Sequence, residues 1–133
     1  HGSSQSIPPA AWTGLSWDTE VLDVGGLHST SANSSRINLT STGIWSAGVS
    51  IEWEANSTGQ RRLQILKNDT TAVATDYEGP DGVAVVLPMT IATAFRVAST
   101  TDYITVRAWT NDPTGIVGTS SNGYRFWATR LSS

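Results

Sequence analysis

The sequence predicts an all-β domain, and three observations support that class. From Gly43 to Trp53, large apolar side chains alternate with small or polar ones, a period of two that fits a strand with one buried face. Turn-forming residues recur roughly every ten positions. None of the 133 residues lies in a stretch with helical periodicity. We therefore expect an antiparallel two-sheet sandwich of the jelly-roll type.

The first residues are expected to precede the folded domain. Residues 1–11 are polar and then proline-rich, which is typical of a lead-in segment or linker. The first four, His1 to Ser4, resemble the remnant of an expression tag. The jelly-roll domain is expected over residues 12–133.

Strands and turns are expected to follow one another through that domain. A short extended piece is expected at 20–24, and a long loop rich in Gly, Asn, Pro and Ser at 111–123. Pro88 lies inside an apolar run and cannot donate to a ladder, which indicates a sheet edge or a bend. The expected strands are 12–17, 36–39, 43–53, 61–67, 71–77, 83–97 (one strand or two), 103–109 and 124–131.

Composition limits the classes of function. Charged residues make up 14% of the chain, against a typical value of about 25%, and Ser, Thr and Asn take their place. The chain has no cysteine, which excludes zinc-finger, thiol-redox and Cys-nucleophile chemistry. A net charge of −3 and a pI of 5.1 argue against a nucleic-acid partner. No apolar run reaches the roughly 20 residues of a membrane span, so we expect no membrane insertion.

Catalytic hypotheses find little support. A copper site at the amino terminus would need His1 and His28, the two histidines. A Ser-His-Asp triad would also depend on His28, and no Gly-x-Ser-x-Gly elbow is present. A glycosidase needs paired carboxylates, but alternation places Glu52 and Glu54 on an exposed strand face. The other nearby carboxylates are Asp18, Glu20 and Asp23. We predict no enzymatic activity and no cofactor.

Calcium binding stays open at one turn. Asp76, Glu78 and Asp81 surround Gly79 and Pro80, and their carboxylate oxygens are ligands that hard cations accept. An acidic turn without a ligand role is the alternative. We assign no metal-binding residues.

Aromatic residues near strand ends indicate a binding face. Such rings could stack on sugar rings, with neighbouring arginines as hydrogen-bond donors. Packing in the core is the alternative for each aromatic residue. The ligand-binding candidates are Trp53, Arg61, Arg62, Tyr77 and Trp109.

Three segments, in this order, resemble one family. They are residues 36–45 (Arg-Ile-Asn-Leu-Thr-Ser-Thr-Gly-Ile-Trp), residues 101–106 (Thr-Asp-Tyr-Ile-Thr-Val) and residues 123–128 (Gly-Tyr-Arg-Phe-Trp-Ala). The chain is similar here to the globular head of complement component 1q and its relatives in the tumour necrosis factor superfamily. Thr101 stands where that family usually has Gly. Residues 17–20, 26–28, 33–36 and 53–63 resemble stretches of the tailed-phage and bacterial versions.

The resemblance implies a tight homotrimer on a virion surface. A chain with many aromatic residues and little charge is also expected to have apolar surface left for an obligate interface. The trimer-facing candidates are Tyr103, Trp109, Tyr124 and Phe126, with burial in the monomer core as the alternative. The implied function is a non-enzymatic module, a head decoration or a tail-fibre tip, that attaches to virion proteins or to a host-surface glycan or protein. The alternative is a secreted, extracellular carbohydrate-binding domain that binds with or without the help of calcium.

Overall fold

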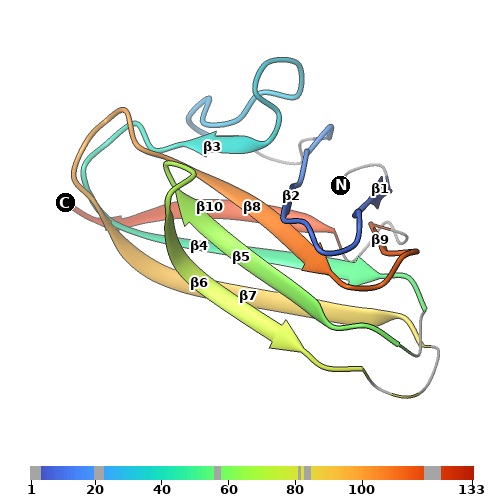
Figure 1. Cartoon of the computed structure of the whole chain (residues 1–133). Coiled ribbons are helices and arrows are strands. Elements are labelled where there is room, and N and C mark those ends of the chain that lie inside the picture. Colours follow the sequence, from blue (N-terminus) through green and yellow to red (C-terminus); the bar gives the residue numbers. More distant parts are fainter. Residues whose placement is uncertain (1–3, 20–22, 56–57, 81, 83–84, 119–123) are drawn as a thin grey trace.

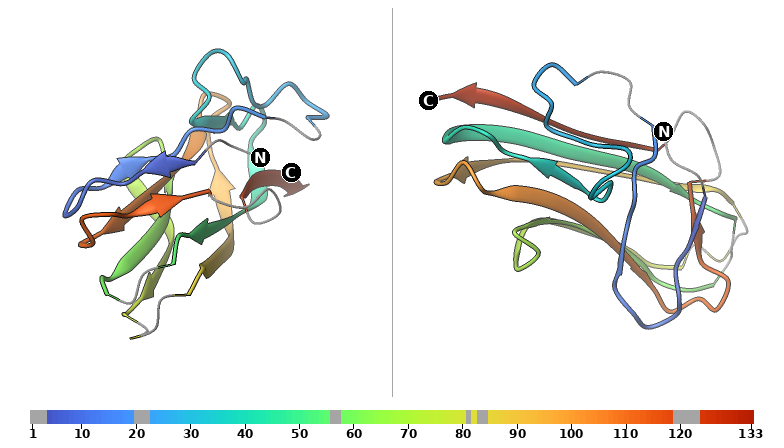
Figure 2. Two further views of the ribbon diagram at one scale, coloured as in Figure 1. Left: turned by 90° about the vertical axis from the view of Figure 1, so that its right-hand side faces the viewer. Right: turned by 90° about the horizontal axis from the view of Figure 1, so that it is seen from above.

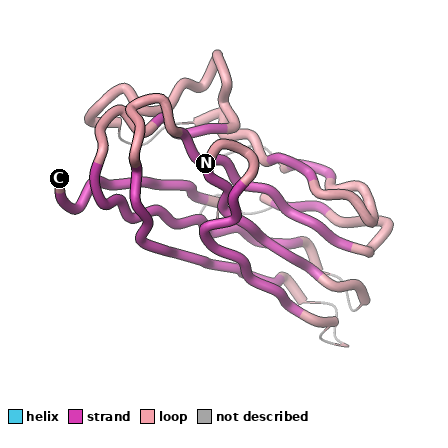
Figure 3. The backbone as a smooth tube through the Cα atoms, turned by 60° about the vertical axis from the view of Figure 1, so that its left-hand side comes forward, coloured by secondary structure: helices cyan, strands magenta, loops and turns pink. Residues whose placement is uncertain are grey.

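In the computed structural model of the chain, the strands form two antiparallel sheets (Figure 1). The structure describes residues 4–19, 23–55, 58–80, 82, 85–118 and 124–133. No helix occurs among these residues, and strand runs through both layers (Figure 3). The all-β prediction is therefore confirmed. The strands are β1 (Gln5–Ser6), β2 (Thr13–Gly14), β3 (Arg36–Asn38), β4 (Gly43–Trp53), β5 (Arg61–Lys67), β6 (Thr71–Glu78), β7 (Leu87–Val97), β8 (Tyr103–Thr110), β9 (Ile116–Val117) and β10 (Arg125–Ser132).

Each sheet is built around one central strand. In the first sheet β4 pairs with β7 on one side and with β10 on the other, and short β9 and β1 extend this sheet at the Trp53 end. In the second sheet β8 pairs with β5 on one side and with both β2 and β3 on the other, while β6 lies outside β5. Viewed from above, the two sheets lie as two layers (Figure 2).

The core lies between the layers because each long strand places alternate side chains there. Trp45, Val49 and Trp53 of β4 are all buried, as the alternation predicts. β8 contributes Ile104 and Val106, both fully buried, from the opposite sheet. The sandwich is thus held by the face that the sequence pattern indicates.

Segments outside the long strands also join the fold. The region expected to be a lead-in contributes β1 and the buried Ile7, whose backbone N–H donates to the Gly115 carbonyl. Of residues 12–17, only Thr13 and Gly14 form a strand, although Leu15 and Trp17 are buried. Within the described part of the loop expected at 111–123, Ile116 and Val117 form β9.

Pro88 neither bends nor interrupts its strand. β7 runs from Leu87 to Val97, and Pro88 is opposite Glu52 in β4. β7 pairs with β4 only, so it is an edge strand of the described sheet. An edge strand tolerates a residue that has no N–H to donate.

Candidate ligand-binding face

The outer face of the second sheet carries an array of arginines and aromatic rings. Alternation in β8 buries Ile104, Val106 and Ala108, so Arg107 and Trp109 lie on the opposite side. The same rule in β5 places Leu63 inside and Arg62 outside. We call this surface the arginine–aromatic face; it consists of Trp12, Arg36, Arg62, Tyr77, Tyr103, Arg107 and Trp109.

Arg62 lies between two aromatic rings. It pairs directly with Tyr77 in β6 and with Trp109 in β8. Its Cζ is 4.4 Å from the centre of the Trp109 ring and 5.5 Å from that of Tyr77, within the range of cation–π attraction. Its Nε is buried with no hydrogen-bond partner among the described residues. The two rings therefore position this guanidinium, while Tyr77 remains 49% exposed.

A second arginine is fixed next to the first along β8. The Arg107 guanidinium carbon lies 4.6 Å from the centre of the Trp12 ring. Its Nε donates to Gln64 Oε1 at 2.8 Å. Gly14 is the partner of Arg107 in β2 and has no side chain to occupy the space beside it. Arg107 is thus held at its Nε, and its two Nη atoms carry no hydrogen bond to the described residues.

A carboxylate completes the other end of the face. Tyr103 Oη donates to Asp69 Oδ2 at 2.8 Å, and Thr105 Oγ1 donates to Asp69 Oδ1 at 2.6 Å. The hydrogen bond to Asp69 raises the pKa of Tyr103 above its ordinary value, with burial adding to the effect. The guanidinium of Arg36 lies 4.9 Å from the centre of the Tyr103 ring. Asp69 is therefore fixed by two hydroxyl donors and forms no salt bridge with the described residues.

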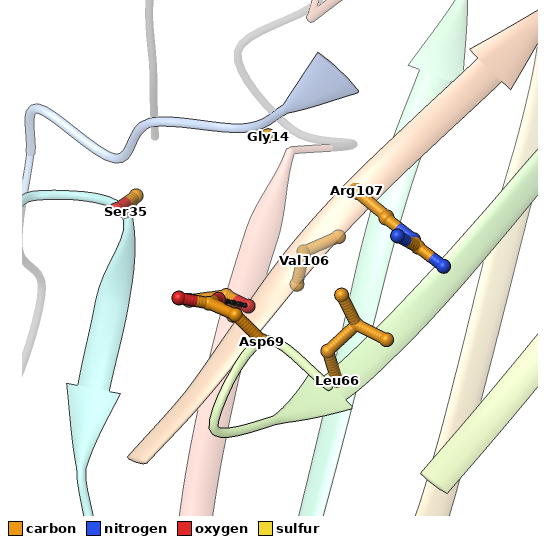
Figure 4. Close-up of a pocket in the computed structure, with 7 residues that line it drawn as sticks. Gly14, Ser35, Leu66, Asp69, Val106 and Arg107 are labelled. Carbon is orange, nitrogen blue, oxygen red and sulfur yellow. Dashed lines mark hydrogen bonds between the residues drawn. The ribbon is translucent and has the colours of Figure 1, made fainter. Parts of the chain in front are cut away.

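An open groove of about 240 Å³ lies on this face, where β2 and β3 leave β8 partly uncovered. In Figure 4, Asp69 and Ser35 lie on one side, Arg107 lies on the other, and Leu66 and Val106 lie between them. The Arg107 guanidinium points away from Asp69 (Figure 4). The groove thus has an acceptor side and an arginine side. Its lining residues are Gly14, Ser35, Leu66, Asp69, Thr105, Val106 and Arg107.

Three of the five predicted ligand-binding residues meet on this face, namely Arg62, Tyr77 and Trp109. The other two lie elsewhere: Trp53 is 1% exposed and Arg61 2% exposed. Trp53 Nε1 donates to Met89 Sδ at 3.1 Å inside the core. Neither residue offers surface to a ligand in this chain.

The four predicted trimer-facing aromatics divide between two places. Tyr103 and Trp109 belong to the arginine–aromatic face. Tyr124 is fully buried within the single chain, 4.4 Å from the ring centre of Trp17, and Phe126 is 5.3 Å from that ring. Tyr124 Oη also contacts Gln5 Nε2, and burial raises the Tyr124 pKa above its ordinary value. Tyr124 is therefore a core residue with no surface left for a neighbour.

Trp12, Arg107 and Asp69 belong to this face but were not among the sequence-predicted site residues. Arg107 and Trp109 are two positions apart in the expected strand 103–109. Alternation along a strand could therefore have placed Arg107 on the same face as Trp109. Trp12 comes just before the two-residue strand β2, and Asp69 lies in the turn between β5 and β6. No periodicity marks such positions.

The residues considered as metal ligands or catalytic groups form no metal-binding cluster in the part of the chain that the structure describes. Among the described residues, no group of three or more His, Asp or Glu side chains could hold a metal ion. Asp76 and Glu78 lie on β6, whereas Asp81, Glu20 and His1 lie outside the described residues. His28 Nε2 is 3.1 Å from the Ser34 carbonyl.

Two further comparisons bear on the chain as a whole. Within the part that the structure describes, no element is a helix with the length and apolar character needed to span a membrane. Compared with protein-family models and with curated proteins, the sequence gives no match.

Proposed function

We propose that this chain is a non-enzymatic binding module that assembles as a homotrimer on a virion surface. The single observation that carries the proposal is the contrast between the two outer sheet faces. One face is the arginine–aromatic face. The other, over β10, β4 and β7, carries small side chains and one large ring at its centre, with Arg96, Arg125 and Glu52 towards its ends. We assign the first to ligand binding and the second to contact between copies of the chain.

The second surface, the small-residue face, consists of Ser46, Gly48, Ser50, Ala92, Ala94 and Trp127. Gly48 lies between Ala92 and Trp127 in the register. A Cβ built on Gly48 would lie 2.1 Å from Trp127 Cζ2, so the indole lies directly over this glycine. Trp127 is 40% exposed. A surface whose centre has small side chains, an exposed ring and no charge is typical of a contact between subunits.

The strand order supports a jelly roll. The early strand β4 pairs with the last strand β10, and β8 pairs with the early strands β2 and β3. Among the strands of the second sheet, only β5 and β6 form a hairpin of consecutive strands. A jelly roll requires such pairing of strands that are far apart in the sequence, with the chain crossing between the two sheets. The virion location is supported by the sequence resemblance to the tailed-phage versions of that fold.

Light scattering tests the proposal directly. A homotrimer has about 42 kDa, three times the 14.1 kDa of the chain. Ala94→Glu places a charge on the small-residue face, and we expect a folded monomer, because a buried unpaired charge is strongly unfavourable. Ala72→Glu is the matched control, since Ala72 is exposed on β6 of the other sheet. A wild-type monomer at micromolar concentration contradicts the proposal.

A carbohydrate-binding domain is the second candidate, and the position of Arg62 between Trp109 and Tyr77 favours it. Aromatic rings with an adjacent donor suit a sugar ring. A glycan array with and without calcium tests this candidate. We expect Tyr77→Ala to abolish any specific signal, because the substitution removes an exposed ring of the binding face. It leaves the core intact, because Tyr77 is not buried. A signal unchanged in Tyr77→Ala and in Trp109→Ala removes this candidate.

A further inference from the structure

We propose that the groove between β2 and β3 binds one acidic sugar unit of an oligosaccharide that extends along β8 to Trp109. This inference rests on the carbohydrate-binding candidate and names both a new subsite and the ligand class. The juxtaposition that carries it is Asp69 on one side of the groove and Arg107 on the other.

The size and lining of the groove suit one ring. A volume of about 240 Å³ is below the range of roughly 300–1,000 Å³ for drug-sized ligands, so a single ring-sized unit fits better than a large molecule. Leu66 and Val106 are buried and close the base of the groove. Ser35 provides a hydroxyl group beside them, and the Thr105 hydroxyl already donates to Asp69.

Asp69 is suited to accept hydrogen bonds from sugar hydroxyls. Each of its two oxygens already accepts one hydroxyl donor, which fixes the carboxylate without neutralising it. An ionised carboxylate oxygen has a further lone pair to offer. A ligand with several hydroxyl groups can therefore complete the coordination of Asp69.

Charge on this face favours an acidic ligand. Arg36, Arg62 and Arg107 provide three positive charges against the one negative charge of Asp69, although the whole chain has a net charge of −3. The Nη atoms of Arg107 carry no hydrogen bond to the described residues and point away from Asp69 (Figure 4), so they can bind a carboxylate or sulfate group at the far side of the sugar unit with paired donors. Concentrating positive charge on one face of an acidic chain indicates an anionic partner.

The spacing along β8 sets the length of the ligand. Thr105, Arg107 and Trp109 alternate on one face of the strand, so each step is about 7 Å. A ligand that occupies the groove and contacts Trp109 therefore spans about 14 Å, which requires more than one sugar ring. A nucleic acid fits less well, because the chain as a whole carries a net charge of −3.

An array of immobilised uronate-containing, sialylated, sulfated and neutral glycans, with single-stranded DNA alongside, tests the proposal. We expect the wild-type protein to bind acid-bearing glycans only, and to lose that signal when salt rises from about 0.05 M to about 0.5 M. Arg107→Gln should weaken binding at least tenfold. Neutral glycans bound equally well, DNA bound more strongly, or no acidic glycan bound at all would each overturn the acidic-sugar assignment.

Gly14→Leu tests the groove itself. A Cβ on Gly14 meets no atom within 4 Å, so a larger side chain fills the groove without straining the fold. We expect at least tenfold weaker binding in Gly14→Leu and unchanged binding in Gly79→Leu. Gly79 is a matched control, because its added Cβ also meets nothing and it does not line the groove. If Tyr77→Ala loses binding and Gly14→Leu keeps it, the groove is not the sugar-binding subsite. The carbohydrate-binding candidate is then still supported.

Discussion

Gly48 and Trp127 show how one residue without a side chain can set the shape of a surface. The indole occupies the space where a Gly48 side chain would be, and it therefore lies flat on the sheet. Any larger residue at position 48 must push the ring towards solvent. The small-residue face depends on this single contact between β4 and β10.

We predict that Gly48→Ala lowers the free energy of unfolding by about 1–2 kcal/mol, since the Trp127 ring loses its packing. Urea unfolding measures the loss. In a Trp127→Ala background the same substitution should cost much less, because the two residues are coupled. Gly14→Ala is the matched control, since its Cβ meets nothing. Equal costs in both backgrounds would show that the ring is not the cause.

Asp102 has a role in stability that depends on pH. Asn68 Nδ2 donates to Asp102 Oδ1 at 2.9 Å, the backbone N–H groups of Ala98 and Ser99 donate to Oδ2, and Lys67 Nζ lies 3.4 Å from Oδ2. The hydrogen bond from Asn68 is the largest cause that holds the pKa of Asp102 below its ordinary value, against the opposing effect of burial. The folded state therefore favours the ionised form.

A lowered folded-state pKa means that Asp102 contributes stability above its unfolded pKa of about 3.9, and that this stability is lost as the pH falls through the folded value. We predict that Asp102→Asn destabilises the protein by about 1–2 kcal/mol at pH 7. The difference from wild type should shrink as the pH falls below about 3.9. Chemical denaturation across pH 2.5 to 7 gives the comparison. A constant difference over that range would contradict the assignment.

At the scale of elements, the β5–β6 turn links the core hairpin to the ligand-binding face. Asn68 and Asp69 both have positive φ, 52° and 58°, as the two central residues of a type I′ turn require, and the Thr70 backbone N–H donates to the Lys67 carbonyl at 3.2 Å. Asn68 Oδ1 also accepts from the Tyr103 backbone N–H. One turn therefore positions Asp69 and fastens the start of β8.

We predict that Asn68→Ala destabilises the protein by about 2–3 kcal/mol, because it loses these side-chain bonds and places Ala in the left-handed region. Asn68→Gly should cost about 1 kcal/mol less, since Gly adopts positive φ freely. Thermal unfolding of the two variants side by side measures the difference. Equal destabilisation would show that the backbone conformation carries no cost.

The long strands could be predicted from the sequence, and the short ones could not. Alternation over 43–53 and 61–67 predicted β4 and β5 with the bounds that the structure has. Two-residue strands such as β1 and β9 contain too few positions for a period to show. Trp53 and Arg61 were predicted to bind a ligand because they lie near a turn, and this was wrong. Each is an even number of positions from a buried residue of its strand, Trp45 or Leu63, so alternation places both on the inner face.

At the scale of the whole molecule, the proposed trimer makes stability depend on concentration. If three copies fold together, mass action stabilises the assembly as protein concentration rises. We predict that the thermal midpoint of the wild type increases by several degrees over a hundredfold rise in concentration. Ala94→Glu should remove this dependence and Ala72→Glu should keep it. Differential scanning fluorimetry at several concentrations provides the measurement, and a constant wild-type midpoint would count against assembly.

The pairing of β4 with β10 also governs how quickly the chain reaches this state. The central strand β4 pairs with β10 and β7, which come later in the chain, and β1 pairs with the late strand β9. Contacts between such distant segments form only after large loops have closed, and proteins built from them fold over milliseconds to seconds. During synthesis on a ribosome, the first half of this chain emerges without the strands that complete its sheets.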